Sequence, residues 1–168
     1  MPNECSGWIL ECREAFPKLN RHAITCEYKK LGKTVLGRVK GQVTRFREIN
    51  PESVFLKGEG KSRLKIKEEH RYEVMINEKI KKAKPDELRK QVVQNIIIHE
   101  LLHVENKDLT ALSKKYSKRK KKKIHIKDFD KECLKRFNEI RGINKMAPIK
   151  SLKQLQEAEE AIVRKLKI

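Results

Sequence analysis

The chain has 168 residues, of which 38% are hydrophobic and 39% are charged, so we expect one domain with a lean core and a heavily charged surface. Lysine and arginine number 42 against 23 acidic residues, which gives a net charge of +19. The charge-rich surface of a heat-adapted protein carries both signs and does not explain this imbalance. The imbalance points to a polyanionic partner, most simply nucleic acid, with an acidic membrane surface as the alternative.

The sequence shows no pattern typical of export or of membrane insertion. The N-terminus lacks a basic region before an apolar one, and no apolar run is long enough to span a bilayer. The four cysteines contain no C-x-x-C pair, so we predict no zinc ribbon and expect reduced, structural thiols at Cys5, Cys12, Cys26 and Cys133. We therefore expect a cytoplasmic protein with no membrane-spanning segment.

The first forty residues predict a helix and a hairpin. Apolar residues at helical spacing favour a helix from Asn3 to Phe16, which Pro17 ends. Alternation favours a strand from His22 to Leu31, and a turn at Gly32-Lys33 leads to a second strand from Thr34 to Val39. We expect these two strands to pair with each other as an antiparallel hairpin.

Residues 42–69 are interrupted by Asn50-Pro51 and by Gly58-Glu59-Gly60, so we interpret them as an irregular insertion or an added hairpin. Arg71 to Ile76 is a clearer strand, and Asn77 opens a short turn or helix that runs to Lys81.

A helix from Pro85 to Glu105 carries the most informative motif of the chain, His99-Glu100-Leu101-Leu102-His103. Two histidines four residues apart lie on one face of a helix, where both imidazoles can bind one zinc ion. In metalloproteases with the His-Glu-x-x-His motif, the glutamate is the general base that accepts a proton from zinc-activated water. The motif therefore predicts His99 and His103 as zinc ligands and Glu100 as the catalytic base.

The context of the motif supports a site. Residues from Val92 to Val104 are mostly apolar, so the helix is expected to be buried on most sides. Because a buried carboxylate or imidazole is costly without a partner or a metal, three such groups together indicate a function. The alternative is a core helix whose histidines bond to backbone groups.

A catalytic zinc needs a third protein ligand, and the downstream candidates are His125, Glu132 and Glu139. We favour His125 because it precedes a helix whose apolar residues would pack on the motif helix and aim it at the metal. Glu132 is the second choice. Asn106 stands where metzincins have glycine, which disfavours that class.

A basic tract separates the second histidine from these candidates. Eight of the ten residues from 114 to 123 are basic: Lys114, Lys115, Lys118, Arg119, Lys120, Lys121, Lys122 and Lys123. Such a block is either a solvated loop or an arm that binds nucleic-acid phosphates. As an arm it would bind DNA without sequence preference and with a steep salt dependence.

The C-terminal third predicts two helices, one from Ile126 to Arg141 closed by Gly142 and one from Leu152 to Leu166 with Ser151 as its N-cap. Together these elements predict an α+β fold with an N-terminal helix, a short antiparallel sheet, the motif helix and C-terminal helices. We expect one domain over residues 1–146, with 147–168 packed on it.

The chain resembles the SprT-like zinc metallopeptidases, a family that includes the Spartan-type proteases. The resemblance rests on the strand Tyr72–Asn77, the motif His99–His103, and His125 with Phe129 four residues later, and it extends from Trp8 to Ile140. It implies a small zincin-like domain, a Zn²⁺ cofactor held by His99, His103 and His125, and a role against proteins crosslinked to DNA.

The expected function is therefore hydrolysis of protein substrates, with DNA bound through the basic tract. We expect an extended substrate to add along the edge of the sheet. Tyr116 is a candidate to stabilise the oxyanion because it lies between the second and third ligands in sequence. The alternative is a non-catalytic, basic nucleic-acid-binding protein with a structural metal.

Overall fold

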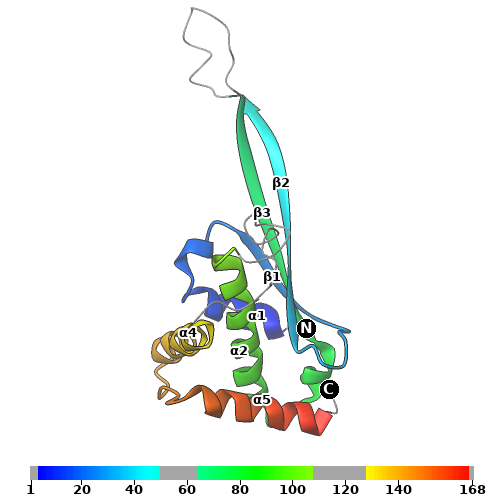
Figure 1. Ribbon diagram of the computed structural model, residues 1–168, viewed down its shortest axis with the longest axis vertical. Helices are drawn as coiled ribbons and strands as arrows, with labels where there is room; N and C mark the ends of the chain where they lie inside the picture. Colours follow the sequence, from blue (N-terminus) through cyan, green and yellow to red (C-terminus); the bar gives the residue numbers. More distant parts are fainter. Residues whose placement is uncertain (1–3, 50–63, 108–127, 167–168) are drawn as a thin grey trace, which may run out of the picture.

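A computed structural model describes residues 4–49, 64–107 and 128–166 (Figure 1). The described chain is α+β, with an N-terminal helix, a three-stranded mixed sheet and then three helices. The helices form a body at one end of the molecule, and a two-stranded ribbon projects from it (Figure 1).

The sheet has the strand order β1-β3-β2, with β1 at Ala23–Lys29, β2 at Gly37–Ile49 and β3 at Leu64–Asn77. β1 runs parallel to β3, and β2 runs antiparallel to it from Gly37 opposite Ile76 to Ile49 opposite Leu64. The predicted hairpin between the first two strands is therefore wrong, because β3 lies between them. β3 takes the centre because its face with Tyr72, Val74 and Ile76 is the most completely buried of the sheet.

The sheet is also longer and less uniform than the short antiparallel sheet predicted. Residues 42–49 and 64–69, predicted to belong to an irregular insertion, continue β2 and β3 as a paired ribbon. The alternative interpretation, an added hairpin, describes these residues correctly. Residues 50–63 lie outside the described part of the chain.

The predicted helices agree with the structure better than the predicted strands do. α1 spans Glu4–Arg13 and ends earlier than predicted, and the short 3₁₀ helix η1 follows at Pro17–Leu19. The 3₁₀ helix η3 at Glu78–Lys82 follows β3, as expected after Asn77. α2 spans Asp86–Glu105, with Pro85 at its N-cap, which confirms the helix predicted for the motif.

α2 is the centre of the core. It contacts α1, the sheet, η3 and the two C-terminal helices, α4 at Phe129–Ile143 and α5 at Leu152–Leu166. Because neighbours surround it, α2 is buried on most sides, and its apolar residues from Val92 to Val104 are among the least exposed of the chain. The predicted burial of the motif helix is confirmed.

α5 begins and ends where the sequence predicts. α4 begins at Phe129, and the first two residues predicted for this helix, 126 and 127, lie outside the described residues. The helix runs through Gly142 to Ile143, so the predicted end at Gly142 is wrong. α5 buries Leu155 and Ile162 against α2, α4 and η3, so the C-terminal helix packs on the same core.

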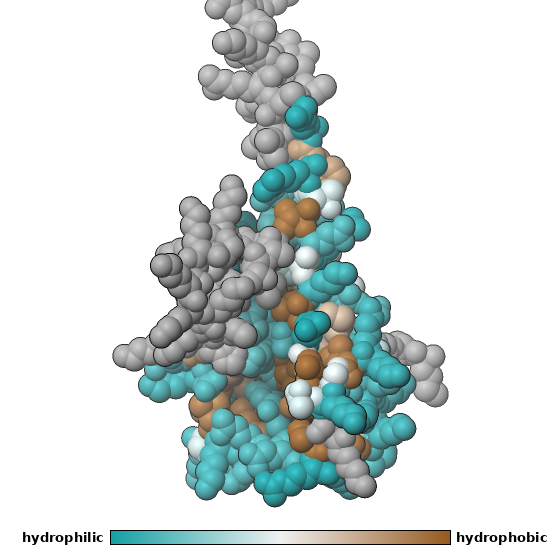
Figure 2. Space-filling model, turned by 45° about the vertical axis from the view of Figure 1, so that its right-hand side comes forward, coloured by the Kyte–Doolittle hydropathy of each residue, from teal (hydrophilic) through white to brown (hydrophobic). Residues whose placement is uncertain are grey.

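All four cysteines are buried and form no disulfide. The face in Figure 2 is mostly hydrophilic, with apolar patches at the base of the ribbon. Among the described helices, none combines the length and the apolar character that a membrane span needs.

Candidate metal centre and the adjoining pocket

His99 and His103 meet one turn apart on α2. Their Nε2 atoms are 3.2 Å apart, and their rings are inclined by 74°. Two nitrogens bound to one tetrahedral zinc at 2.0–2.1 Å would lie about 3.3 Å apart, so the pair fits two ligand positions of one ion. His103 is only 6% exposed, which makes an unpartnered imidazole costly there.

Phe129, the first residue of α4, packs against both imidazoles. Its ring centroid lies 5.0 Å from that of His99 and 4.9 Å from that of His103. The predicted apolar face of this helix is confirmed, because Phe129, Cys133 and Phe137 are all buried. The start of α4 therefore lies at the histidine pair and limits how the two rings can turn.

Glu100 lies where β2 begins to cross α2. A Cβ atom added to Gly37 would overlap Cγ2 of Ile96 and would lie 3.5 Å from Oε1 of Glu100. Only glycine lets the strand approach the motif helix this closely. Sequence reasoning gave Gly37 no role, although an isolated glycine in a strand pattern is a signal of close backbone approach.

Asn77 fixes the loop that precedes β2. The side chain is 1% exposed, and its Nδ2 donates to the carbonyl oxygens of Val35 at 2.9 Å and Gly32 at 3.3 Å. Its backbone N–H donates to the carbonyl of Leu36 at 2.9 Å. Sequence reasoning identified Asn77 only as the start of a turn, because these partners lie more than 40 residues away.

A pocket of about 410 Å³ adjoins the motif, between the start of β2 with its preceding loop, α2, α4 and α5. His99 and Glu100 form part of its wall, as do Asp130 of α4 and Glu159 of α5. Its described wall contains three carboxylates and no lysine or arginine. Burial first, and then the charges of Asp130 and Glu159, raise the pKa of the Cys133 thiol in this wall to about 12.

Glu159 and Asn95 form a polar pair in the pocket wall. Nδ2 of Asn95 donates a hydrogen bond to Oε1 of Glu159, while burial raises the pKa of that carboxyl. Oδ1 of Asn95 is buried and accepts no hydrogen bond from the described residues. The neighbours Glu157 and Glu160 differ, because each forms an ion pair along α5, with Lys153 at 3.8 Å and with Arg164 at 2.8 Å.

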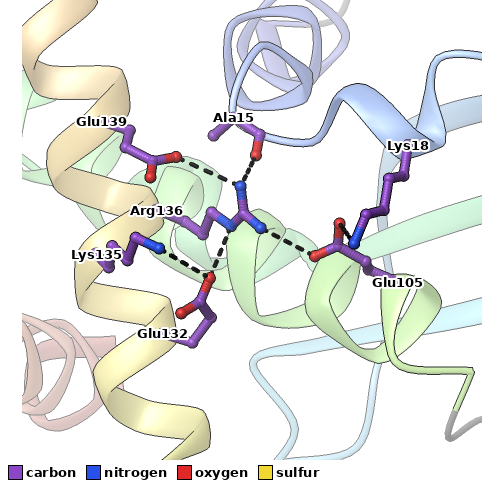
Figure 3. A network of polar contacts seen from close by, with 7 residues as sticks. All are labelled: Ala15, Lys18, Glu105, Glu132, Lys135, Arg136 and Glu139. Atoms are coloured by element: carbon purple, nitrogen blue, oxygen red, sulfur yellow. Dashed lines mark hydrogen bonds and ion pairs between the residues drawn. The ribbon is translucent and has the colours of Figure 1, made fainter.

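The predicted third ligand, His125, lies outside the described residues, as do Tyr116 and the basic tract of Lys114, Lys115, Lys118, Arg119, Lys120, Lys121, Lys122 and Lys123. The other candidates are described and are engaged elsewhere. Arg136 on α4 forms ion pairs with Glu132 at 3.1 Å and with Glu139 at 3.5 Å (Figure 3). Over residues 4–49, 64–107 and 128–166, no three histidine, cysteine or acidic side chains gather as a metal site.

The same arginine ties α4 to the end of the motif helix. Nη2 of Arg136 lies 3.2 Å from Oε2 of Glu105, Nη1 donates to the carbonyl of Ala15, and the guanidinium lies 5.0 Å from the ring of Phe16 (Figure 3). Lys18 adds a longer contact to Glu105 at 4.0 Å. The network therefore joins α4, α2 and the segment after α1, and it sets the position of α4 relative to the motif.

A larger concavity of about 1570 Å³ lies between η1, the ribbon and the end of α2. His22 is half-buried there with its ring 5.0 Å from that of His70, and Nδ1 of His70 lies 3.2 Å from the Tyr72 hydroxyl. Its described wall mixes both signs of charge: Lys18, Arg21, Lys67, Lys107, Glu68, Glu69 and Glu105. With both signs present, the described wall does not select a ligand by its charge.

Comparisons of the chain with protein-family models, with curated proteins and with solved structures return no match.

Proposed function

We propose that this chain is a zinc-dependent peptidase of SprT-like type. The observation that carries the proposal is the 3.2 Å approach of the His99 and His103 Nε2 atoms, beside a pocket whose wall contains Glu100. A helix that serves only as core has no need for a carboxylate and an imidazole in the wall of a pocket, with a second imidazole one turn further along.

In this proposal His99 and His103 bind zinc through Nε2, and His125 is the third ligand. His125 precedes Phe129 by four positions, a length of chain that reaches at most about 14 Å, so the contacts of the Phe129 ring with the pair are compatible with His125 as a ligand. The ion pairs of Glu132 and Glu139 with Arg136 also favour His125 over the two carboxylates.

The chemistry divides between the metal and the chain. Zinc, when bound, supplies a Lewis acid that makes water acidic enough to lose a proton near neutral pH. Glu100 accepts that proton and passes it to the leaving amine. Its carboxylate lies close to the start of β2, at Gly37. Phe129 holds the two imidazoles in place.

Substrate orientation follows from the position of β2. It is the outer strand of the described sheet on the side of the pocket, so an extended peptide can pair with its backbone and pass over Glu100. The net charge of +19 and the basic tract support DNA as a second partner, and hence DNA-bound or DNA-crosslinked proteins as substrates.

Metal analysis followed by a cleavage assay tests the proposal. We expect close to one equivalent of zinc in the purified protein, lost in His99→Ala and His103→Ala, and cleavage of casein or histone that a chelator abolishes and single-stranded DNA stimulates. One equivalent of metal with no cleavage, with or without DNA, would favour the non-catalytic nucleic-acid-binding protein instead.

A further inference from the structure

We propose that a group of lysines at the base of the sheet binds the phosphate backbone of double-stranded DNA. This base patch consists of two lysines in the loop between β1 and β2 and two in η3: Lys30, Lys33, Lys81 and Lys82. The inference rests on the proposed function for the choice of DNA as partner, and it adds a binding surface separate from the basic tract.

The first argument is the local concentration of positive charge. Residues 29–40 contain five basic residues and no acidic one, and residues 78–84 contain four lysines and one glutamate. The whole chain has 42 basic residues against 23 acidic ones, so both segments are far more one-sided than the average. A surface with one sign of charge attracts a polyanion.

Asn77 brings the two segments together. Its Nδ2 donates to the carbonyl oxygens of Gly32 and Val35 in the loop, and its Oδ1 accepts from the backbone N–H of Lys79 in η3. Because the Asn77 side chain is buried, these contacts fix the loop relative to η3. Both segments lie at the end of the sheet away from the projecting ribbon (Figure 1).

The lysines of the base patch face solvent and form no ion pair with the described residues. In η3, Ile80 and Ala83 are buried, three residues apart as in one face of a 3₁₀ helix. The intervening Lys81 and Lys82 therefore point outward. The two loop lysines of the patch are exposed as well.

The acidic residues near η3 do not neutralise the base patch. Asp86 pairs with Lys84 at 2.7 Å and with Arg89 at 3.2 Å. Arg89 also pairs with Glu4 at 3.1 Å. Glu78 adds one exposed carboxylate against the four lysines of the patch. The patch therefore keeps a net positive charge that phosphate groups can balance.

The side chains around the base patch favour duplex DNA over a membrane or a single strand. The large hydrophobic residues exposed in the described chain lie outside both segments: Leu10, Phe46, Ile143 and Met146. An interfacial membrane site inserts apolar side chains beside its cations, and a single-strand site stacks bases on aromatic rings. Duplex DNA carries one charge per about 1.7 Å of its axis and requires neither.

The loop also connects the base patch to the proposed site. Directly after Lys33, the residues from Thr34 to Gly37 line the pocket whose wall contains His99 and Glu100. DNA held by the patch would lie beside this pocket, and a protein crosslinked to that DNA would be close to the candidate metal centre.

DNA binding by a quadruple variant tests the inference. The variant combines Lys30→Gln, Lys33→Gln, Lys81→Gln and Lys82→Gln, and fluorescence anisotropy with a labelled duplex measures its affinity. We expect binding about tenfold or more weaker than that of the wild type at ~0.1 M salt. The slope of log affinity against log salt should become shallower by up to about 3.5.

A second quadruple variant controls for net charge. It removes the same charge from exposed lysines on or next to α4 and α5, three of which already pair with an acidic residue: Lys131→Gln, Lys135→Gln, Lys150→Gln and Lys153→Gln. Its affinity should stay within about twofold of the wild type. Equal weakening in the two variants would mean that overall charge, and not the base patch, determines binding.

Lysine acetylation tests the same surface in the wild-type protein, without any substitution that could disturb the fold. Mass spectrometry should show that the duplex protects the four lysines of the base patch from acetylation and leaves the four control lysines reactive. Absence of this protection would overturn the inference. Tighter binding to phosphatidylserine vesicles than to the duplex, lost in the base-patch variant, would overturn it in favour of a membrane surface.

These binding measurements do not depend on cleavage, so they separate the inference from the peptidase proposal. If the wild type cleaves no protein but the base-patch variant loses DNA affinity, the peptidase proposal fails and the base patch stands. If the wild type cleaves protein and the base-patch variant binds DNA as the wild type does, the peptidase proposal stands and the base patch is rejected.

Discussion

At the scale of single residues, the candidate site depends on positions of two kinds. His99, Glu100 and His103 are chemically informative types, and their spacing alone indicates what they can do. Gly37 and Asn77 are informative only in the fold, because one makes room for β2 beside Glu100 and the other holds the loop before it.

Gly37→Ala tests the close approach of the strand to the motif helix. The added methyl group would overlap Ile96, so β2 or α2 must shift, and we expect a loss of about 1–3 kcal/mol in the free energy of unfolding. Urea unfolding measures the loss. Cleavage by the folded fraction should also fall, because the shift occurs beside Glu100.

Gly7→Ala is the matched control. Gly7 lies in α1 with nothing within 4 Å of an added Cβ, so alanine should stabilise the helix by about 0.5–1 kcal/mol. Equal effects of the two substitutions would mean that Gly37 does not mark a close contact.

At the scale of elements, α4 is positioned by charge as well as by its apolar face. The Arg136 side chain is 17% exposed and that of Glu105 only 11%, so their ion pair is largely shielded from solvent. Arg136→Met leaves Glu105 without this partner, and we expect a loss of about 3 kcal/mol in the free energy of unfolding. Arg136→Lys should recover only part of it, because lysine cannot bond to several acceptors in the same planar geometry.

Lys131→Gln on the same helix is the control for charge. Lys131 pairs with Asp128 but its side chain is 79% exposed, so its removal should leave the free energy of unfolding almost unchanged. Comparable losses in Arg136→Met and Lys131→Gln would show that the network does not hold α4 in place.

How far the sequence predicts the elements depends on the range of the interactions that form them. α2 and α5 are predicted closely because helical periodicity and end signals are local. The strand pairing is not predicted, because β1 pairs with β3 in the register Ala23 to Arg71, far apart in sequence, and no local pattern distinguishes that partner from β2. The ribbon of β2 and β3 was partly missed because its polar outer half lacks a buried face.

The candidate site divides in the same way. The motif predicts the histidine pair and Glu100, because a spacing of four residues fixes which side chains meet on a helix. Sequence reasoning could not find the pocket wall, since Asn95, Asp130 and Glu159 come from three helices that meet only in the fold.

At the scale of the whole molecule, opposite charges are separated in the chain. The densest group of basic residues lies at residues 114–123, whereas the charged residues in the described wall of the pocket beside the motif are acidic. Under the proposed function, this separation would let the basic tract bind DNA away from the pocket.

Replacing Lys120 to Lys123 by glutamine tests the DNA partner. If each lysine neutralises one phosphate, the slope of log affinity against log salt should become shallower by up to about 3 for single-stranded DNA. Fluorescence anisotropy at several salt concentrations measures the slope, and cleavage of a DNA-free peptide should not change. An unchanged affinity and slope would exclude the tract as the binding segment.

The most direct test of the central claim is the cleavage rate of Glu100→Gln at the same zinc content as the wild type. The amide has nearly the shape of the carboxylate but cannot accept the proton from water, so we expect full zinc occupancy and a fall in kcat of about a hundredfold or more. A Glu100→Gln protein that holds zinc and cleaves protein at the wild-type rate would contradict the claim.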